Sequence, residues 1–192
     1  MSTGEDNKDN LNIPDLSKED MGNLKVTLSQ LENSVTKEKC ADTIRYCKWL
    51  TEKVDIHLLA NKQEQARAGH QKKHHPTRPR RGEIYLTQLG QNIGKEINDQ
   101  HLVVIMQNNK ANIFSNTVVV IPISSSGKLY DGHEKIEEDD IKSGRLDKLP
   151  SKVKTEQVQF IDKARLIHKV AEFTDDAMVR ISLRLGKTLD LK

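Results

Sequence analysis

Two short segments of the sequence hold residue types that handle phosphates and protons. The loop Gln91–Gln100 contains Gly94, Lys95 and Glu96, and His101 follows it where an apolar run begins. Lysine supplies a positive charge, whereas histidine titrates near neutral pH and can act as a general acid or base. Such a loop could bind a phosphate and move protons. A histidine at the start of a strand is also commonly structural or solvated.

The second segment, Ser124–Gly127, follows another apolar run and reads Ser-Ser-Ser-Gly. Serine hydroxyls at the end of a strand can donate hydrogen bonds to a phosphoryl oxygen. Serines before a glycine are also typical of a plain turn. The residues alone therefore leave both interpretations open at both segments.

The sequence lacks the motifs of several other chemistries. Its seven histidines form no His-x-x-x-His pair on one helix with a carboxylate partner, so we expect no metal site and no cofactor. It contains no Gly-x-x-x-x-Gly-Lys loop and no Gly-x-Ser-x-Gly elbow. These absences argue against nucleotide hydrolysis and serine-hydrolase chemistry.

The elements that position the two segments are expected to be strands. Apolar and β-branched runs predict strands at residues 83–89, 101–107, 117–123 and 153–160. Pro122 indicates an edge or a bulge near the end of the third run.

The remainder of the C-terminal part is expected to be a surface excursion and a helix. Residues 131–147 are acidic, as expected of an excursion. Thr174 followed by two aspartates predicts the start of a final helix. Successive strands followed by a helix indicate a compact β-rich barrel or sandwich. One face of that helix is apolar: Ala177, Ile181, Leu185 and Leu189.

The N-terminal part is predicted to be helical. Residues 1–14 are expected to be disordered, residues 15–68 helical, and residues 69–80 a basic linker that could also hold phosphates. A capping pattern at Ser17–Asp20 begins the first helix, and the second is expected from about Thr36 to Ala68. The second helix has one apolar stripe, which the first helix, the C-terminal domain or another chain must cover: Cys40, Ile44, Cys47, Leu50, Val54 and Leu58.

Composition bounds the class of protein. The chain has 192 residues, of which 35% are hydrophobic and 31% charged, and its net charge is +3. No apolar run approaches 18 residues, and the N-terminus does not resemble a signal peptide. We therefore expect a cytoplasmic protein without a membrane partner.

Residues 81–192 resemble the toxins of the PemK/MazF family. The most specific match is Glu156–Leu166, which is similar to the family's Glu-Gln-Ile-Arg-Thr-Ile-Asp-Lys-x-Arg-Leu segment. The other matches occur in the same order as in the family: Arg81-Gly-Glu-Ile-Tyr85, Gly94-Lys-Glu96, Val103–Asn108, Thr117–Ser125 and Phe173–Met178.

The resemblance implies an α+β fold: an SH3-like β-barrel with a C-terminal helix, here preceded by N-terminal α-helices. It also implies a homodimer that cleaves single-stranded RNA without a metal ion. In that reaction the ribose 2′-hydroxyl attacks the adjacent phosphate and leaves a 2′,3′-cyclic phosphate and a 5′-hydroxyl. An antitoxin protein would block the RNA-binding groove.

The family's active site is changed in this sequence. The family has an arginine five residues after the loop glutamate, and that position is His101 here. The threonine of its Thr-Ser pair is Ser124, which keeps a hydroxyl. We expect His101 to move protons and Ser124 to hold the phosphate. The substrate-binding residues implied by the resemblance are Lys95, Glu96, Ser125 and Arg81.

Three questions remain open from the sequence. Loss of the arginine could instead leave a catalytically impaired binding module for nucleic acid or a protein partner. The N-terminal helices could form a dimerisation arm, mask the groove within the same chain, or dock another protein. Because CcdB toxins share this fold class, a DNA-gyrase-directed role is a further alternative, based on fold analogy alone.

Overall fold

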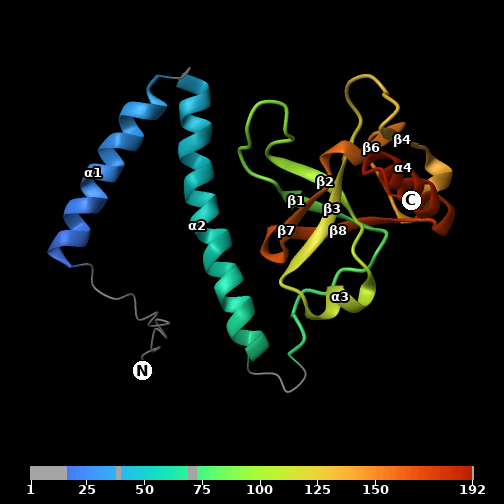
Figure 1. Cartoon of the computed structure of the whole chain (residues 1–192), viewed down its shortest axis with the longest axis horizontal. Helices are drawn as coiled ribbons and strands as arrows, with labels where there is room; N and C mark the ends of the chain where they lie inside the picture. The colour runs from blue at the N-terminus through green and yellow to red at the C-terminus, as the bar shows by residue number, and fades with distance from the viewer. Residues whose placement is uncertain (1–16, 38–39, 69–72, 192) are drawn as a thin grey trace, which may run out of the picture. The chain divides into compact units, whose positions relative to one another are not determined.

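The computed structural model describes residues 17–37, 40–68 and 73–191 (Figure 1). The predicted disorder of residues 1–14 lies outside this range. The chain divides into two compact units, Met1–Tyr46 and Cys47–Lys192, and each is described by itself. No helix in the described ranges is long and apolar enough to cross a membrane.

The first helix, α1 (Lys18–Val35), begins with the predicted capping box. The Ser17 hydroxyl accepts a hydrogen bond from the Asp20 amide, and the Asp20 carboxylate accepts one from the Ser17 amide. Two otherwise unpaired groups are satisfied in this way, which fixes where the helix begins. The second helix, α2, spans Cys40–Ala68, and the two residues before it lie outside the described ranges.

The C-terminal part is an antiparallel sheet that curls into a half-barrel, as the expected α+β fold requires (Figure 1). Its order is β4-β6-β3-β2-β1-β8-β5, and β7 also pairs with β3. The strands are β1 Glu83–Gln88, β2 Gln100–Ile105, β3 Thr117–Ser124, β4 His133–Ile136, β5 Ile141–Gly144, β6 Ser151–Lys154, β7 Gln159–Asp162 and β8 Leu166–Phe173. A short helix, α3 (Asn109–Phe114), lies between β2 and β3.

Two expectations about the strands were wrong. Residues 153–160 do not form one strand, because the 3-10 turn η2 (Thr155–Gln157) separates β6 from β7. Residues 131–147 are not only an excursion, since they contribute β4 and β5. Backbone pairing with β6 and β8 compensates for the low apolar content of these two strands.

Pro122 lies inside the sheet at a change of pairing partner. On one side it pairs with Val103 of β2. On the other side β3 pairs with β7 up to Val120 and with β6 only from Ile123. Pro122 therefore lies in the gap between the β3–β7 pairing and the β3–β6 pairing. No strand pairs with it on that side, so its lack of a backbone N–H costs the sheet no hydrogen bond.

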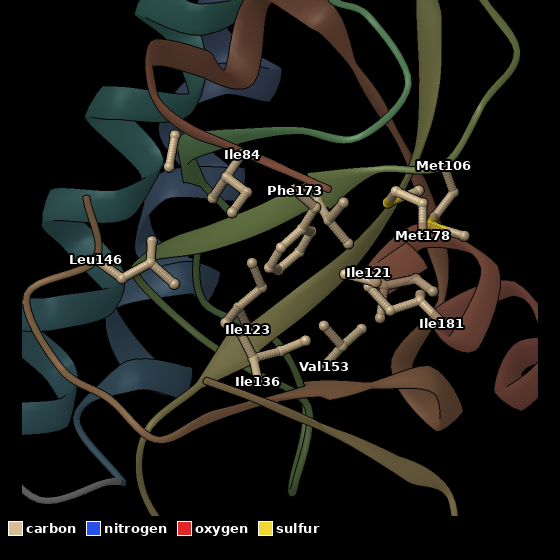
Figure 2. Close-up of a cluster of buried hydrophobic side chains, with 13 residues drawn as sticks. Ile84, Met106, Ile121, Ile123, Ile136, Leu146, Val153, Phe173, Met178 and Ile181 are labelled. Carbon is tan, nitrogen blue, oxygen red and sulfur yellow. The ribbon is translucent and has the colours of Figure 1, made fainter. Parts of the chain in front are cut away.

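The main core lies between the sheet and α4 (Asp175–Thr188) (Figure 2). Aliphatic side chains dominate it, and Phe173 is its only aromatic member among the described buried residues. The predicted cap of α4 is present, because the Thr174 hydroxyl accepts a hydrogen bond from the Ala177 amide. Ala177 and Ile181 are buried as expected, whereas Leu189 is exposed.

A second apolar cluster lies on the other face of the sheet. It consists of Leu89, Val103, Ile105, Val118, Val120 and Ile161, with Tyr85, Ile97 and Leu166 packed against it. Neighbouring residues of β2 and β3 alternate between this second cluster and the main core, as strand geometry requires.

The apolar stripe expected on α2 is exposed rather than buried. Leu50, Val54 and Leu58 are all exposed. A different stripe of the same helix is partly buried and includes Trp49 and Ile56. Its burial depends on packing against the sheet domain, which the spacing of apolar residues in the sequence does not reveal.

Trp49 of α2 packs against the residues that follow β1. Its ring lies beside Gly90, two residues after the end of β1, and 5.4 Å from the guanidinium carbon of Arg165. Arg165 donates hydrogen bonds to the carbonyls of Gln88 and Leu89 at 3.1 and 3.0 Å. The Gln88 side chain in turn donates to Glu52 of α2 at 2.5 Å. This part of α2 therefore packs at the base of the β1–β2 loop.

A buried lysine connects α3 to the turn after β7. Lys163 is completely buried, and its Nζ donates to the Asn112 carbonyl at 2.6 Å. Burial, followed by the nearby charge of Arg67, lowers the pKa of Lys163 to about 8. The folded protein thus holds this proton less tightly than the unfolded chain does.

This shift in pKa predicts how stability depends on pH. Between about pH 8 and pH 10.5 the unfolded chain binds more protons at Lys163 than the folded protein, so the free energy of unfolding rises with pH. The rise is at most about 3 kcal/mol. Urea unfolding at pH 8 and pH 10 should show it in the wild type and show a smaller rise for Lys163→Met. An equal rise in both proteins would contradict the assignment.

Candidate active site

His101 and Ser124 lie on adjacent strands at the same edge of the sheet. In the register of β2 and β3, Leu102 pairs with Ile123, so the next position outward places His101 opposite Ser124. Leu102 and Ile123 face the main core, and therefore His101 and Ser124 point to the opposite face. The structure thus brings together the two residues that the sequence selected as catalytic.

The His101 ring is partly buried and uncharged near neutral pH. Burial lowers its pKa below the ordinary value of 6.5; a hydrogen bond with the backbone of Ile123 acts in the opposite direction, and the charge of Lys154 lowers it further. Nε2 is enclosed and has no hydrogen-bond partner among the described residues. A neutral imidazole is the form that accepts a proton.

The Ser124 hydroxyl is largely buried and helps to form a turn. It accepts a hydrogen bond from the Ser126 amide at 3.3 Å and lies 3.2 Å from the Ser126 hydroxyl. Lys152, which pairs with Ser124 across β3 and β6, donates to the Gly127 carbonyl at 2.6 Å and to that of Ser126. Ser125, between the two serines, is exposed. The segment is therefore a turn that also fixes a hydroxyl beside His101.

The β1–β2 loop is closed at its base and fastened near its tip. The Leu89 amide donates to the Asp99 carbonyl at 2.9 Å, which closes the base. Gln157 accepts a hydrogen bond from the Ile97 amide at 3.1 Å and donates to the Lys95 carbonyl at 3.2 Å. The turn η2 thereby holds the loop in a defined position.

Lys95 and Glu96 line a surface hollow with a volume of about 540 Å³. Gln157 and Gln159 are among the other polar residues that line it. The Glu96 carboxylate accepts a hydrogen bond from the Ile93 amide at 3.2 Å and so stabilises the loop itself. His101 and Ser124 do not line this hollow.

Arg81 lies away from these residues. It precedes β1, whereas Thr87 near the other end of β1 is the residue that pairs with His101. Six strand residues correspond to about 20 Å. Arg81 instead donates to the Met106 carbonyl and, at 2.8 Å, to the Ser182 hydroxyl of α4. The structure therefore does not bring Arg81 together with the other predicted site residues.

Three further polar residues near the site were missed by the sequence analysis. Lys154 acts on the His101 ring, Gln157 holds the loop, and Thr87 faces His101 from β1. Gln157 lies in the segment Glu156–Leu166 and could have been selected from it. Thr87 and Lys154 carry no local signal, because only strand pairing places them near His101.

The described part of the chain contains no group of three or more His, Cys, Asp or Glu residues that could hold a metal ion.

The chain is similar to several solved structures. It covers 93% of an endoribonuclease from a mycobacterial species, over 59% of its own length, with 20% identity and a TM-score of 0.48. It covers 96% of an endoribonuclease solved with its cognate antitoxin, also mycobacterial, over 60% of its length, with 21% identity and a TM-score of 0.47. It covers 96% of MazF from Deinococcus radiodurans, over 58% of its own length, with 17% identity and a TM-score of 0.48.

A protein-family model gives the family directly. The model described as the PemK-like, MazF-like toxin of type II toxin–antitoxin systems matches residues 80–189, which is more than half of the chain. The matched range contains every strand of the sheet, His101, Ser124, the β1–β2 loop and all of α4. The chain therefore belongs to the PemK/MazF-like family of type II toxins.

Proposed function

We propose that this protein is an endoribonuclease that cleaves single-stranded RNA without a metal ion. The observation that supports this proposal most directly is the placement of His101, a neutral imidazole, beside the Ser124 hydroxyl on one face of the sheet. Membership of the toxin family supports the same reaction. RNA is the substrate, an antitoxin protein is the inhibitor, and the active form is a homodimer in the cytoplasm.

In the proposed reaction His101 accepts the proton of the ribose 2′-hydroxyl. The 2′-oxygen forms a bond to the adjacent phosphorus, and the bond from phosphorus to the 5′-oxygen breaks. The departing 5′-oxygen takes up a proton from the imidazolium, so protons and charges balance. The products are a 2′,3′-cyclic phosphate and a 5′-hydroxyl.

The surrounding residues stabilise the phosphate in this scheme. The Ser124 hydroxyl donates a hydrogen bond to a phosphoryl oxygen, and Lys154 adds positive charge near His101. Lys95 and Glu96 contact the RNA from the β1–β2 loop, and Ser125 contacts it from the serine turn. Lys95 and Ser125 are exposed, as contact with a polymer requires.

A second candidate is a family member that binds RNA or a protein partner without cleaving. Two observations favour it: Nε2 of His101 is enclosed, and the Ser124 hydroxyl is already engaged with Ser126. In the first proposal, the proton of the ribose 2′-hydroxyl must therefore reach the His101 ring, which is only partly open to solvent.

One experiment separates the two candidates. Full-length protein is incubated with a long single-stranded RNA in the presence of EDTA, and the ends of the fragments are identified. Cleavage with cyclic-phosphate and 5′-hydroxyl ends is the expected result. Binding of the RNA without cleavage would overturn the ribonuclease proposal and support the binding module.

A further inference from the structure

The described part of the basic segment before β1 is packed on the sheet domain. The His75 ring is buried, and its Nδ1 accepts a hydrogen bond from the Thr77 amide at 3.0 Å. The His75 amide donates to the Ile113 carbonyl of α3 at 2.8 Å, and Pro79 is buried as well. These contacts hold the backbone of the segment against α3. The arginines of the segment therefore extend from a fixed backbone rather than from a free linker.

Two of these arginines line a surface hollow with a volume of about 420 Å³, which we name the arginine hollow. Its lining residues include no carboxylate: Arg78, Pro79, Arg80, Asn109 and Ile113. The Asn109 Oδ1 accepts a hydrogen bond from the Arg81 amide at 2.8 Å, which identifies Nδ2 as the donor end of that side chain. The side-chain groups that remain for a ligand are thus all hydrogen-bond donors.

The guanidinium groups of the arginine hollow have unused donors. Nε of Arg78 donates to the His75 carbonyl at 2.9 Å, which orients the side chain and leaves its two terminal nitrogens without a partner among the described residues. The guanidinium of Arg80 forms no ion pair or hydrogen bond with the described residues. Glu83 accepts a hydrogen bond from the Arg80 amide but forms its ion pair with Lys169. The planar fork of arginine matches the oxygens of a phosphate, so these donors suit that anion.

Positive charge is in excess beside the arginine hollow. Burial is the main cause of the lowered pKa of Lys163, and the charges of Arg67 and Arg78 act in the same direction, whereas Asp162 opposes them. Arg67 is itself paired with Glu64 at 3.3 Å. Two carboxylates therefore lie among three cations, and this part of the surface attracts anions.

We propose that the arginine hollow binds a backbone phosphate of single-stranded RNA away from the cleaved bond. This inference rests on the proposed function. The hollow lies beside the start of β1, whereas His101 pairs with Thr87 near the other end of that strand, so the two sites are roughly 20 Å apart. At about 3.4 Å per stacked nucleotide, the RNA must extend roughly six nucleotides beyond the cleaved bond to reach the hollow.

The first test measures binding and does not depend on cleavage. A fluorescent 2′-O-methyl RNA of about 12 nucleotides, which lacks the attacking 2′-hydroxyl, is titrated with full-length protein at several salt concentrations. We expect Arg80→Gln to raise Kd about 10-fold and to flatten the slope of log Kd against log salt by about 0.7, the value for one phosphate contact with a single strand. The Arg80 side chain forms no hydrogen bond with the described residues, so the variant should fold like the wild type.

Arg145→Gln is the matched control. Arg145 is an exposed arginine that follows β5 and does not line the arginine hollow, so its replacement removes the same charge from another place. We expect this variant to keep the Kd and the salt slope of the wild type. Equal weakening in Arg80→Gln and Arg145→Gln, no weakening in Arg80→Gln, or no RNA binding by the wild type would overturn the proposal.

Cleavage distinguishes this inference from the proposed function. In an active enzyme, Arg80→Gln should raise KM for a long RNA and leave kcat unchanged, because the arginine hollow is remote from His101. A substrate of about three nucleotides cannot reach from the cleaved bond to the hollow, so Arg80→Gln should not change its kcat/KM. Absence of cleavage in the wild type would refute the ribonuclease proposal alone, since the binding test uses RNA that cannot be cleaved.

A free phosphate ion is the other source of the same chemical group. Urea unfolding in inorganic phosphate and in chloride of equal ionic strength measures its binding by the wild type and by Arg80→Gln. We expect phosphate to raise the urea midpoint more in the wild type than in Arg80→Gln, together with the loss of RNA affinity in that variant. A difference in phosphate without a difference in RNA affinity would assign the hollow to a small phosphate ion and overturn the assignment to RNA.

Discussion

Replacing His101 by alanine is expected to lower the rate of RNA cleavage by about 10²- to 10⁴-fold, the usual contribution of a general acid–base group. The alanine cannot take the proton of the 2′-hydroxyl, whereas Ser124 and the β1–β2 loop remain to bind the RNA. The loss should therefore appear in kcat more than in KM. Single-turnover cleavage of a long RNA in EDTA measures it.

The wild-type pH profile should show the lowered pKa of His101. The base must be neutral, so activity falls as the pH decreases through the pKa of the folded protein, which lies below 6.5. His101→Arg restores the residue expected from the resemblance to the family but does not titrate in this range. We expect that variant to lose the acid limb, whatever activity it retains.

His168 provides a matched control. It is an exposed histidine on β8, and His168→Ala should cleave at the wild-type rate. If His101→Ala also cleaves at the wild-type rate, His101 is not the proton carrier and its enclosed ring is structural.

Replacing Gly90 by alanine is expected to displace Trp49. Gly90 has a φ angle of +90°, and an added Cβ would lie 2.6 Å from Cε2 of Trp49. The backbone strain costs about 1 to 2 kcal/mol, and the overlap with the ring adds to it unless the ring moves away. Moving the ring also removes its contact with Arg165.

The experiment has a direct reporter, because Trp49 is the only tryptophan in the chain. We expect Gly90→Ala to shift its fluorescence emission to longer wavelength and to lower the urea midpoint. Gly94→Ala is the control: Gly94 also has positive φ, at +64°, but a Cβ there would meet no atom within 4 Å. Gly94→Ala should lower the stability only by the backbone strain and should leave the fluorescence emission of Trp49 unchanged. Unchanged emission in Gly90→Ala would show that Trp49 does not pack on the loop base.

The result also bears on the N-terminal helices. From Cys47 onward α2 belongs to the same compact unit as the sheet, although it lies outside the residues matched by the family model. Its contacts reach the base of the loop that carries Lys95 and Glu96. Masking of the RNA site within one chain, a dimerisation arm and a docking site for another protein all remain proposals for these helices. Altered RNA cleavage in Gly90→Ala, but not in Gly94→Ala, would favour the first.

The sequence by itself determined the features that depend on neighbouring residues. The caps at Ser17 and Thr174 and the first three strands are encoded by short-range patterns of hydrogen-bonding and apolar side chains, and they occur as predicted. The selection of His101 and Ser124 came from the family resemblance. Their adjacency follows from the antiparallel pairing of consecutive strands.

Only the tertiary structure decided the features that depend on distant pairing. It divided residues 153–160 at η2, placed Arg81 away from His101, and partly buried Trp49 rather than the expected stripe of α2. It also paired Thr87 of β1 with His101 of β2. The physical reason is that strand register and helix packing minimise the free energy of the whole sheet domain, so contacts between residues far apart in the chain fix which side chains are buried together.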